Sequence, residues 1–225
     1  MLLKLSVQAF VYAALIGLVL FLPAGTWRWP EGWVFIAEIV VGSLGLGFWL
    51  MQTNPALLSE RMRAPVQADQ KSWDKLFVGL IALAFIGWMG LMAVDAKRYG
   101  WSDVPLWLKV VGALGPLACY GVTALAFAVN SGASAVVKVG EAQSHLVADT
   151  GPYRFVRHPM YSGALLFFVG TPLLLGSCWG LAASPLLGLA LGIRAVLEER
   201  ALFAELPGYA DYARRVHSRL IPAVW

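Results

Sequence analysis

The chain contains little charge and little cysteine for its length. Only 13% of its 225 residues are charged, whereas soluble domains carry roughly a quarter, and its mean hydropathy is +0.69. Its two cysteines, Cys119 and Cys178, fall in apolar segments and form no CxxC pair, so neither a disulfide framework nor a cysteine zinc site is predicted. This composition excludes an ordinary soluble domain and predicts an integral membrane protein.

Several functional motifs are also missing. The three histidines lack HExxH spacing, so no metal site is predicted. No GxGxxG follows a strand, because the glycines of residues 42–47 lie in an apolar run, where small residues favour close helix packing. The basic residues behind the net charge of +4 are scattered over loops. A soluble Rossmann-type enzyme and a nucleic-acid-binding protein are therefore disfavoured, and no obligate protein partner is indicated.

What the sequence does contain is a series of long apolar runs. Four of them are long enough to cross a hydrocarbon core, at about residues 5–24, 31–51, 75–95 and 104–130. A fifth run, at about 161–176, is short and contains Pro172, and a sixth, at about 179–197, follows it after a tight turn. Whether both of these cross the membrane is left open by their lengths.

We therefore expect an all-α polytopic membrane bundle of five to six membrane helices, with a C-terminal helical hairpin and a cytoplasmic cofactor-binding loop. The sequence has no internal repeat and no segment long enough for a separate soluble domain. Residues 1–225 are predicted to form a single integral membrane domain. Residues 1–130 would be its four-helix scaffold and residues 131–225 its cofactor-binding and catalytic portion.

The basic residues predict the orientation of this bundle. If six segments cross the membrane, thirteen of the seventeen Lys and Arg residues fall on the side of the N-terminus. Cytoplasmic loops carry an excess of such residues. Both termini and the loop of residues 131–160 are thus expected in the cytoplasm, which for a bacterial protein places the chain in the inner membrane.

Residues 151–163 combine arginines, tyrosines and a histidine directly before the fifth apolar run. Pro159 fits the first turn of a helix, and the free N–H groups of such a turn can face a carboxylate. A basic patch that meets anionic headgroups is the alternative. That alternative accounts for Arg154 and Arg157 but not for the surrounding Gly151, Tyr153 and Tyr161, so we favour a site.

A second candidate feature is the pair Glu198 and Glu199 at the end of the sixth run. On a helix, Glu198 has Arg194 one turn behind it, whereas the neighbours of Glu199 three and four residues away are all apolar. A carboxylate in such surroundings is costly without a cationic partner. Arg157 and Arg154 are the candidate partners, and two solvated interfacial glutamates are the alternative.

Three further features carry weaker signals. The amphipathic segment of residues 54–63, which includes Arg61, is interpreted as a helix that contacts lipid headgroups rather than as a catalytic element. Glu38 lies inside the second apolar run, where an ionisable residue indicates either a function or a structural hydrogen bond. His217, beside two arginines in the tail, is most simply solvated.

Several of these motifs occur together in one known family. The C-terminal part of the chain, about residues 138–222, resembles the isoprenylcysteine carboxyl methyltransferase-like and phospholipid methyltransferase membrane enzymes. The resemblance is carried by His145-Leu146-Val147, Gly151-Pro152-Tyr153, Arg157-His158-Pro159-x-Tyr161-x-Gly163, Glu198-Glu199, Tyr209-x-x-Tyr212 and Ile221-Pro222. Residues 1–130 match only in being helical.

The resemblance implies S-adenosylmethionine as methyl donor and a lipophilic or lipid acceptor that arrives from the bilayer. The cofactor-binding residues that it implies are His145, Leu146, Val147, Gly151, Tyr153, His158, Pro159, Tyr161 and Glu198. Arg157, Glu198 and Glu199 would be catalytic, with Arg157 orienting an acceptor carboxylate. Carboxylate O-methylation is favoured and lipid amine N-methylation is possible, in which case Glu199 would act as a base.

Two other functions remain open from the sequence. One is an NADPH-dependent membrane reductase of the sterol or steroid type, with comparable His-Pro and Tyr elements. The other is a non-enzymatic lipid-binding membrane protein. The two are distinguished from a methyltransferase by the cofactor that the protein binds, or by the absence of cofactor binding.

Overall fold

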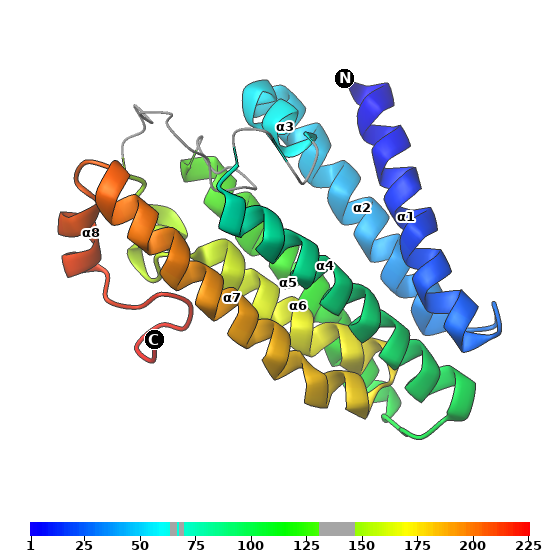
Figure 1. Cartoon of the computed structure of the whole chain (residues 1–225). Coiled ribbons are helices and arrows are strands. Elements are labelled where there is room, and N and C mark those ends of the chain that lie inside the picture. Colours follow the sequence, from blue (N-terminus) through cyan, green and yellow to red (C-terminus); the bar gives the residue numbers. More distant parts are fainter. Residues whose placement is uncertain (64–66, 68–69, 131–146) are drawn as a thin grey trace.

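The computed structural model describes residues 1–63, 67, 70–130 and 147–225, and within these residues all extended regular elements are helices. Their bounds are α1 (Leu2–Ala24), α2 (Pro30–Thr53), α3 (Pro55–Arg61), α4 (Ser72–Ala93), the π-helix η1 (Val94–Tyr99), α5 (Leu106–Val129), the 3₁₀ helix η2 (Gly151–Arg154), α6 (Pro159–Leu175), α7 (Cys178–Glu205) and α8 (Tyr209–Arg215). Figure 1 shows the long helices side by side in one bundle, with successive long helices running in opposite directions.

Five helices are long and apolar enough to cross a membrane: α1, α2, α4 together with η1, α5 and α7. The sixth, α6, has 17 residues and is about 25 Å long at 1.5 Å per residue, less than the roughly 30 Å of a hydrocarbon core. The chain is therefore a multi-pass integral membrane protein. The predicted all-α polytopic bundle is confirmed.

Local sequence signals set the ends of the helices. Pro30, Pro55 and Pro159 each occupy the first turn of a helix. A backbone N–H at this position has no hydrogen-bond partner within the helix, so its absence in proline costs nothing. The Asn54 side chain caps α3 by accepting a hydrogen bond from the Leu57 N–H at 3.0 Å. Gly176 ends α6 with a φ of +84°, a conformation that glycine adopts without strain. It forms the tight turn of the predicted α6–α7 hairpin.

The closest helix contact in the bundle joins α5 and α6. A Cβ atom added to Gly115 would lie 2.6 Å from both the Gly170 Cα and the Leu166 carbonyl oxygen, and one added to Gly112 would lie 2.4 Å from the Leu174 N. Backbones approach this closely only where small residues line both helices. The glycines hold α6 closely against α5 although α6 is short.

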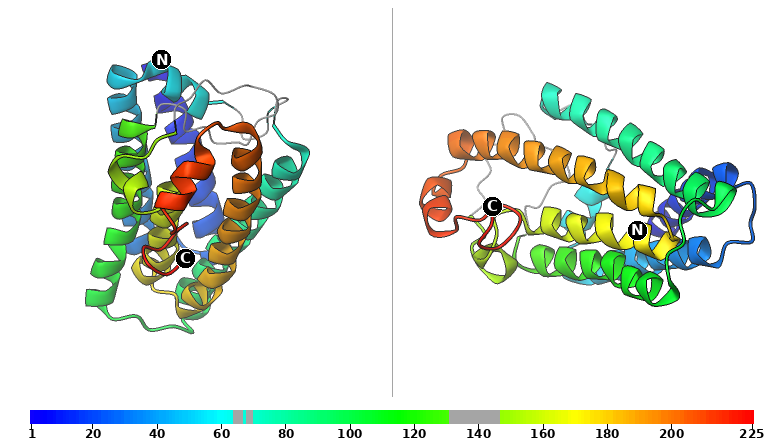
Figure 2. Two further views of the ribbon diagram at one scale, coloured as in Figure 1. Left: turned by 90° about the vertical axis from the view of Figure 1, so that its left-hand side faces the viewer. Right: turned by 90° about the horizontal axis from the view of Figure 1, so that it is seen from below.

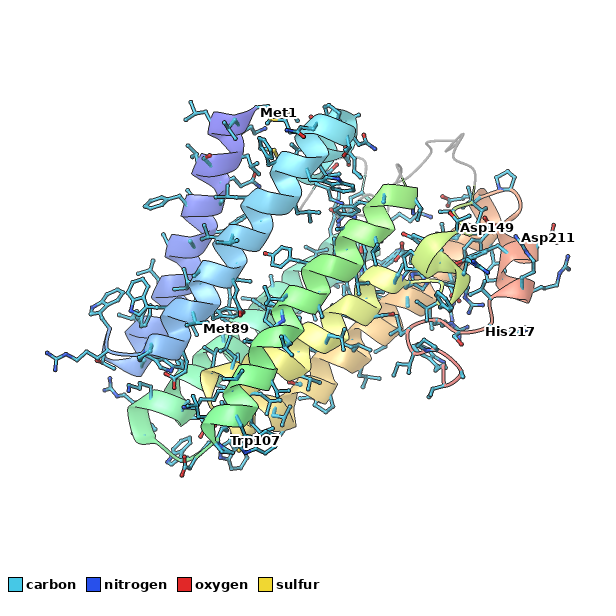
Figure 3. The ribbon with its side chains drawn as sticks, turned by 180° about the vertical axis from the view of Figure 1, so that it is seen from behind. Met1, Met89, Trp107, Asp149, Asp211 and His217 are labelled. Atoms are coloured by element: carbon cyan, nitrogen blue, oxygen red, sulfur yellow. The ribbon has the colours of Figure 1, made fainter. Side chains whose placement is uncertain are left out.

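The polar elements gather at one end of the bundle. Figures 1 and 2 place η2, α8 and the C-terminal tail beside the start of α6 and the end of α7, and α3 lies at this same end. Figure 3 shows Asp149, Asp211 and His217 there, and Trp107 at the opposite end. Residues that are far apart in the sequence therefore meet where α6 begins and α7 ends.

Candidate functional site

The Arg157–His158 segment is held by the C-terminal tail. The Arg157 N–H donates to the Ser218 carbonyl and the His158 N–H to the Arg219 carbonyl, both at 3.0 Å. His158 is the N-cap residue of α6, and Pro159 is its first helical residue. Because the tail runs along this segment, the Arg219 side chain enters the same space as Arg157 and His158.

Glu199 is the centre of this cluster. Its side chain is only 4% exposed, and it accepts hydrogen bonds from Arg157 Nε at 2.7 Å and from Arg219 Nε at 2.9 Å. A third contact joins it to His158 Nε2 at 3.3 Å. Since Glu199 accepts here, the Nε2–H tautomer of His158 satisfies the contact. The carboxylate that the sequence left without a partner on its own helix is thus fully paired.

Arg157 is as buried as its partner. Its side chain is 7% exposed, and its Nη1 donates to the carbonyls of Ala213 at 3.4 Å and Val216 at 3.2 Å. It therefore joins the ends of α6, α7 and α8. The predicted proximity of Arg157 to the acidic pair is confirmed by these contacts, while Arg154 lies exposed in η2.

Glu198 has a different environment. Its Oε2 accepts a hydrogen bond from the Tyr161 hydroxyl at 2.7 Å and lies 3.9 Å from His158 Nδ1. The rings of His158 and Tyr161 stack in parallel, with centroids 5.3 Å apart. At 27% exposure, the Glu198 side chain is the more accessible carboxylate of the pair. It retains lone pairs for a further ligand.

Aromatic side chains form a wall beside the two glutamates. Tyr153, Tyr209 and Tyr212 are buried in one cluster, which Val147 partly covers. Tyr212 donates to the Tyr153 carbonyl at 2.9 Å, and Asn130 donates to the Tyr153 hydroxyl at 2.9 Å. Burial raises the pKa of all three tyrosines. They are therefore neutral hydroxyls throughout the physiological range.

A further ion pair lies next to this site. Arg194 binds Asp74 of α4 through Nε at 3.1 Å and Nη2 at 3.4 Å. Asp74 is fully buried and also accepts from Gln70 at 2.8 Å. The sequence related Arg194 only to Glu198, one helical turn away. Tertiary packing gives it a carboxylate on another helix, because α4 lies against α7 in the bundle.

Comparison with known proteins relates this chain to membrane methyltransferases in sequence and in fold. Residues 114–206 match the model of the phospholipid methyltransferase family. The fold is similar to that of the eukaryotic intramembrane Ras methyltransferase, isoprenylcysteine carboxyl methyltransferase, with a TM-score of 0.60 and 19% identity over 94% of this chain and 75% of that chain. No curated protein matches the chain significantly in sequence.

The chain has the fold of a membrane methyltransferase. The predicted resemblance to the isoprenylcysteine carboxyl and phospholipid methyltransferases is confirmed by both matches. The matched residues 114–206 run from α5 to α7 and include Arg157, Tyr161 and the glutamate pair. Apart from Arg219, the polar cluster around Glu199 is therefore part of the region that matches the family.

Most of the predicted site residues meet at this end of the methyltransferase fold. They lie in the segment before η2, in η2, in the segment between η2 and α6, at the start of α6 or near the end of α7, and they are Val147, Gly151, Tyr153, Arg157, His158, Pro159, Tyr161, Glu198 and Glu199. His145 and Leu146 lie outside the described residues. The ligands of these side chains stay a prediction.

The sequence analysis missed Arg219 and did not single out Arg61. Arg219 lies twenty residues after Glu199, beyond two helix ends, so no helical periodicity connects the two. A basic residue shortly before Ile221-Pro222 was the only available signal. The segment of residues 54–63 was expected to contact lipid headgroups, which stays a prediction, and its Arg61 turns toward Met160 at the start of α6. Among the described residues, no three His, Cys, Asp or Glu side chains gather as metal ligands would.

Proposed function

We propose that this protein is an S-adenosylmethionine-dependent methyltransferase of the membrane, which methylates a lipophilic acceptor. One observation supports the proposal: the Arg157–Glu199 and Tyr161–Glu198 contacts bring four of the residues proposed for the site together at one end of a bundle whose fold is similar to that of a methyltransferase. The region matching the phospholipid methyltransferase family contains all four residues. The acceptor would approach from the bilayer.

The residues present suit such a donor. The positive sulfonium and ammonium groups of the donor are stabilised by a nearby carboxylate and by aromatic rings. Glu198 offers an accessible carboxylate beside the stacked rings of His158 and Tyr161. The Tyr209 hydroxyl is buried and, within the described part of the chain, has no hydrogen-bond partner. A buried hydroxyl of this kind is available to a polar ligand.

We assign the donor to the residues that the family resemblance implies. They are His145, Leu146, Val147, Gly151, Tyr153, His158, Pro159, Tyr161 and Glu198. When bound, the donor supplies a methyl group activated by a positive sulfur. The tyrosine wall and the apolar helix ends limit water around it, which favours the reaction of a cation with an anion.

The contacts of Glu199 support carboxylate O-methylation over lipid amine N-methylation. An ammonium acceptor must first lose a proton to a base, whereas a carboxylate is already a nucleophile. Glu199 accepts from Arg157, Arg219 and His158 at once. A carboxylate so fully paired is a poor base, so we infer that Glu199 positions Arg157 and His158.

Arg157 remains our candidate for orienting the acceptor carboxylate. In the structure its Nε and Nη2 bind Glu199, and its Nη1 binds main-chain carbonyls. An acceptor carboxylate would bind to the N–H groups of Arg157 that these partners do not use. We further propose that this end of the bundle faces the cytoplasm, as the distribution of the basic residues predicts.

The proposal is tested with the purified full-length protein in detergent. Incubation with S-adenosylmethionine labelled in its methyl group and a total membrane lipid extract should label a lipid. Mild alkali should release the label as methanol if the product is an ester, whereas an N-methyl group withstands alkali. A label that resists alkali would contradict carboxylate methylation, and absence of both labelling and S-adenosylhomocysteine binding would overturn the methyltransferase.

Two variants sharpen this test. Glu198→Gln should weaken S-adenosylhomocysteine binding about tenfold or more, because a hydrogen bond to a charged group is lost. Glu205→Gln on the same helix removes the same charge from an exposed pair with Lys71 and should leave binding nearly unchanged. A protein that binds NADPH in competition, and not S-adenosylhomocysteine, would instead be a reductase.

A further inference from the structure

Arg61, the last residue of α3, is held against the start of α6. Its Nη2 donates to the Met160 Sδ at 3.3 Å, and its guanidinium carbon lies 4.6 Å from the centre of the Phe127 ring. Leu57 and Leu58 on the same helix are buried at 3% exposure. These apolar anchors fix α3 so that Arg61 turns toward the start of α6.

The guanidinium of Arg61 forms no ion pair with the residues that the structure describes. Its Nε is buried without a hydrogen bond, and the thioether of Met160 is only a weak acceptor. Burial lowers the pKa of Arg61 to about 10, so the group stays charged at neutral pH. A partly buried cation without an ion pair is costly, which favours an anion at this position.

Comparison with two other arginines shows which edge of the guanidinium is available. Arg157 binds Glu199, and Arg194 binds Asp74, each through Nε and Nη2. This edge carries two parallel N–H groups that match the two oxygens of a carboxylate. On Arg61 the same two nitrogens meet only the sulfur of Met160.

The neighbours of Arg61 are residues to which we assign the donor. Arg61 interacts electrostatically with Tyr153, Tyr161 and Glu198, and Met160 lies between Pro159 and Tyr161 in the sequence. Arg61 and Glu198 thus place one cation and one accessible anion near the start of α6. An amino-acid group, with its ammonium and its carboxylate, complements this pair.

We propose that Arg61 binds the carboxylate of the methionine moiety of the methyl donor through its Nε and Nη2. This inference rests on the proposed function. It makes α3, from the N-terminal part of the chain, a wall of the donor site. The acceptor carboxylate would offer the same chemistry, so the test must separate the two sources.

Two ligands separate them. S-adenosylhomocysteine has the amino-acid carboxylate, whereas 5′-methylthioadenosine has the same nucleoside and sulfur without it. Calorimetry on the full-length protein in detergent should show that Arg61→Gln weakens S-adenosylhomocysteine binding about tenfold to a hundredfold. The affinity for 5′-methylthioadenosine should stay within about twofold, since only the carboxylate contact is lost.

The control is Arg63→Gln, which removes the same charge two residues away. The Arg63 side chain is 47% exposed and pairs with Glu60, so this variant should bind both ligands as the wild type does. If Arg61→Gln does not fold, Arg61→Lys replaces it in the same comparison. Lys keeps the charge but loses the two-pronged contact, so we expect a smaller, still selective loss.

The possible results lead to different conclusions. Equal weakening of both ligands would show that Arg61 shapes the pocket and would overturn the carboxylate contact. Unchanged S-adenosylhomocysteine binding would overturn it too, and a simultaneous loss of methyl transfer would then point to the acceptor carboxylate. Failure of the wild type to bind either ligand would remove the proposed function, and this inference with it.

Discussion

The buried cluster around Glu199 predicts an unequal response to the loss of either partner of its ion pair. Glu199→Gln removes the single anion that compensates Arg157, which is 7% exposed, and Arg219, which is 30% exposed. Loss of one partner from a buried pair costs about 3–5 kcal/mol. Because water can reach Arg219, we expect Glu199→Gln to lower the free energy of unfolding by about 3 kcal/mol, the lower end of this range.

Arg157→Gln should cost less. Glu199 would keep the hydrogen bond from Arg219 at 2.9 Å and the contact with His158 at 3.3 Å. The loss is then that of hydrogen bonds between charged groups, about 1.5–3 kcal/mol. The double variant should lose less than the sum of the single losses, with a coupling of roughly 1–3 kcal/mol.

The measurement is SDS-induced unfolding in mixed micelles, followed by tryptophan fluorescence. Arg215→Gln and Asp149→Asn provide a matched pair, because these side chains also bind at 2.8 Å but are 65% and 39% exposed. The coupling energy between Arg215→Gln and Asp149→Asn should be below about 1 kcal/mol. Additive losses at Arg157 and Glu199, or a larger loss for Arg157→Gln, would refute the assignment of Glu199 as the compensating charge.

Two further predictions concern the scaffold. Gly115→Ala places a Cβ 2.6 Å from the backbone of Gly170 and should destabilise the α5–α6 contact by about 1–3 kcal/mol in the same SDS titration. Gly121→Ala in the same helix meets nothing within 4 Å and should be neutral or stabilising, so the reverse order would contradict the packing argument. Asp95→Asn should cost about 1–3 kcal/mol, because this fully buried carboxylate accepts from Ser177 at 2.6 Å. Calorimetry should find its S-adenosylhomocysteine affinity unchanged, since Asp95 lies at the opposite end of the bundle, and weaker binding by the folded variant would show that the two ends are coupled.

The extent of the helices could be predicted closely from the sequence. The runs expected at about 31–51 and 104–130 correspond to α2 (Pro30–Thr53) and α5 (Leu106–Val129). In a membrane every backbone group must be satisfied within its own segment, so apolar length alone determines a helix. The tight turn after the short α6 was also predicted, because Gly176 marks it.

The meeting of Arg157 with Glu199 was predictable for a similar reason. A carboxylate whose helical neighbours are all apolar needs a cation from elsewhere. The sequence analysis named Arg157 and Arg154 as the candidate cations, and the structure pairs Arg157 with Glu199. What the sequence could not indicate was that Arg219 shares this carboxylate, or that Arg194 binds Asp74 across 120 residues.

Composition and apolar periodicity by themselves determined that this protein is a helical membrane protein, and a few short motifs determined which end carries the polar chemistry. Both are local properties, governed by the solvent that each segment meets. Only the tertiary structure decided how each charge is paired: Glu199 with three donors, Arg194 with Asp74, and Arg61 in no ion pair with the described residues. Those partners come from different helices, and their distances depend on how closely the helices pack.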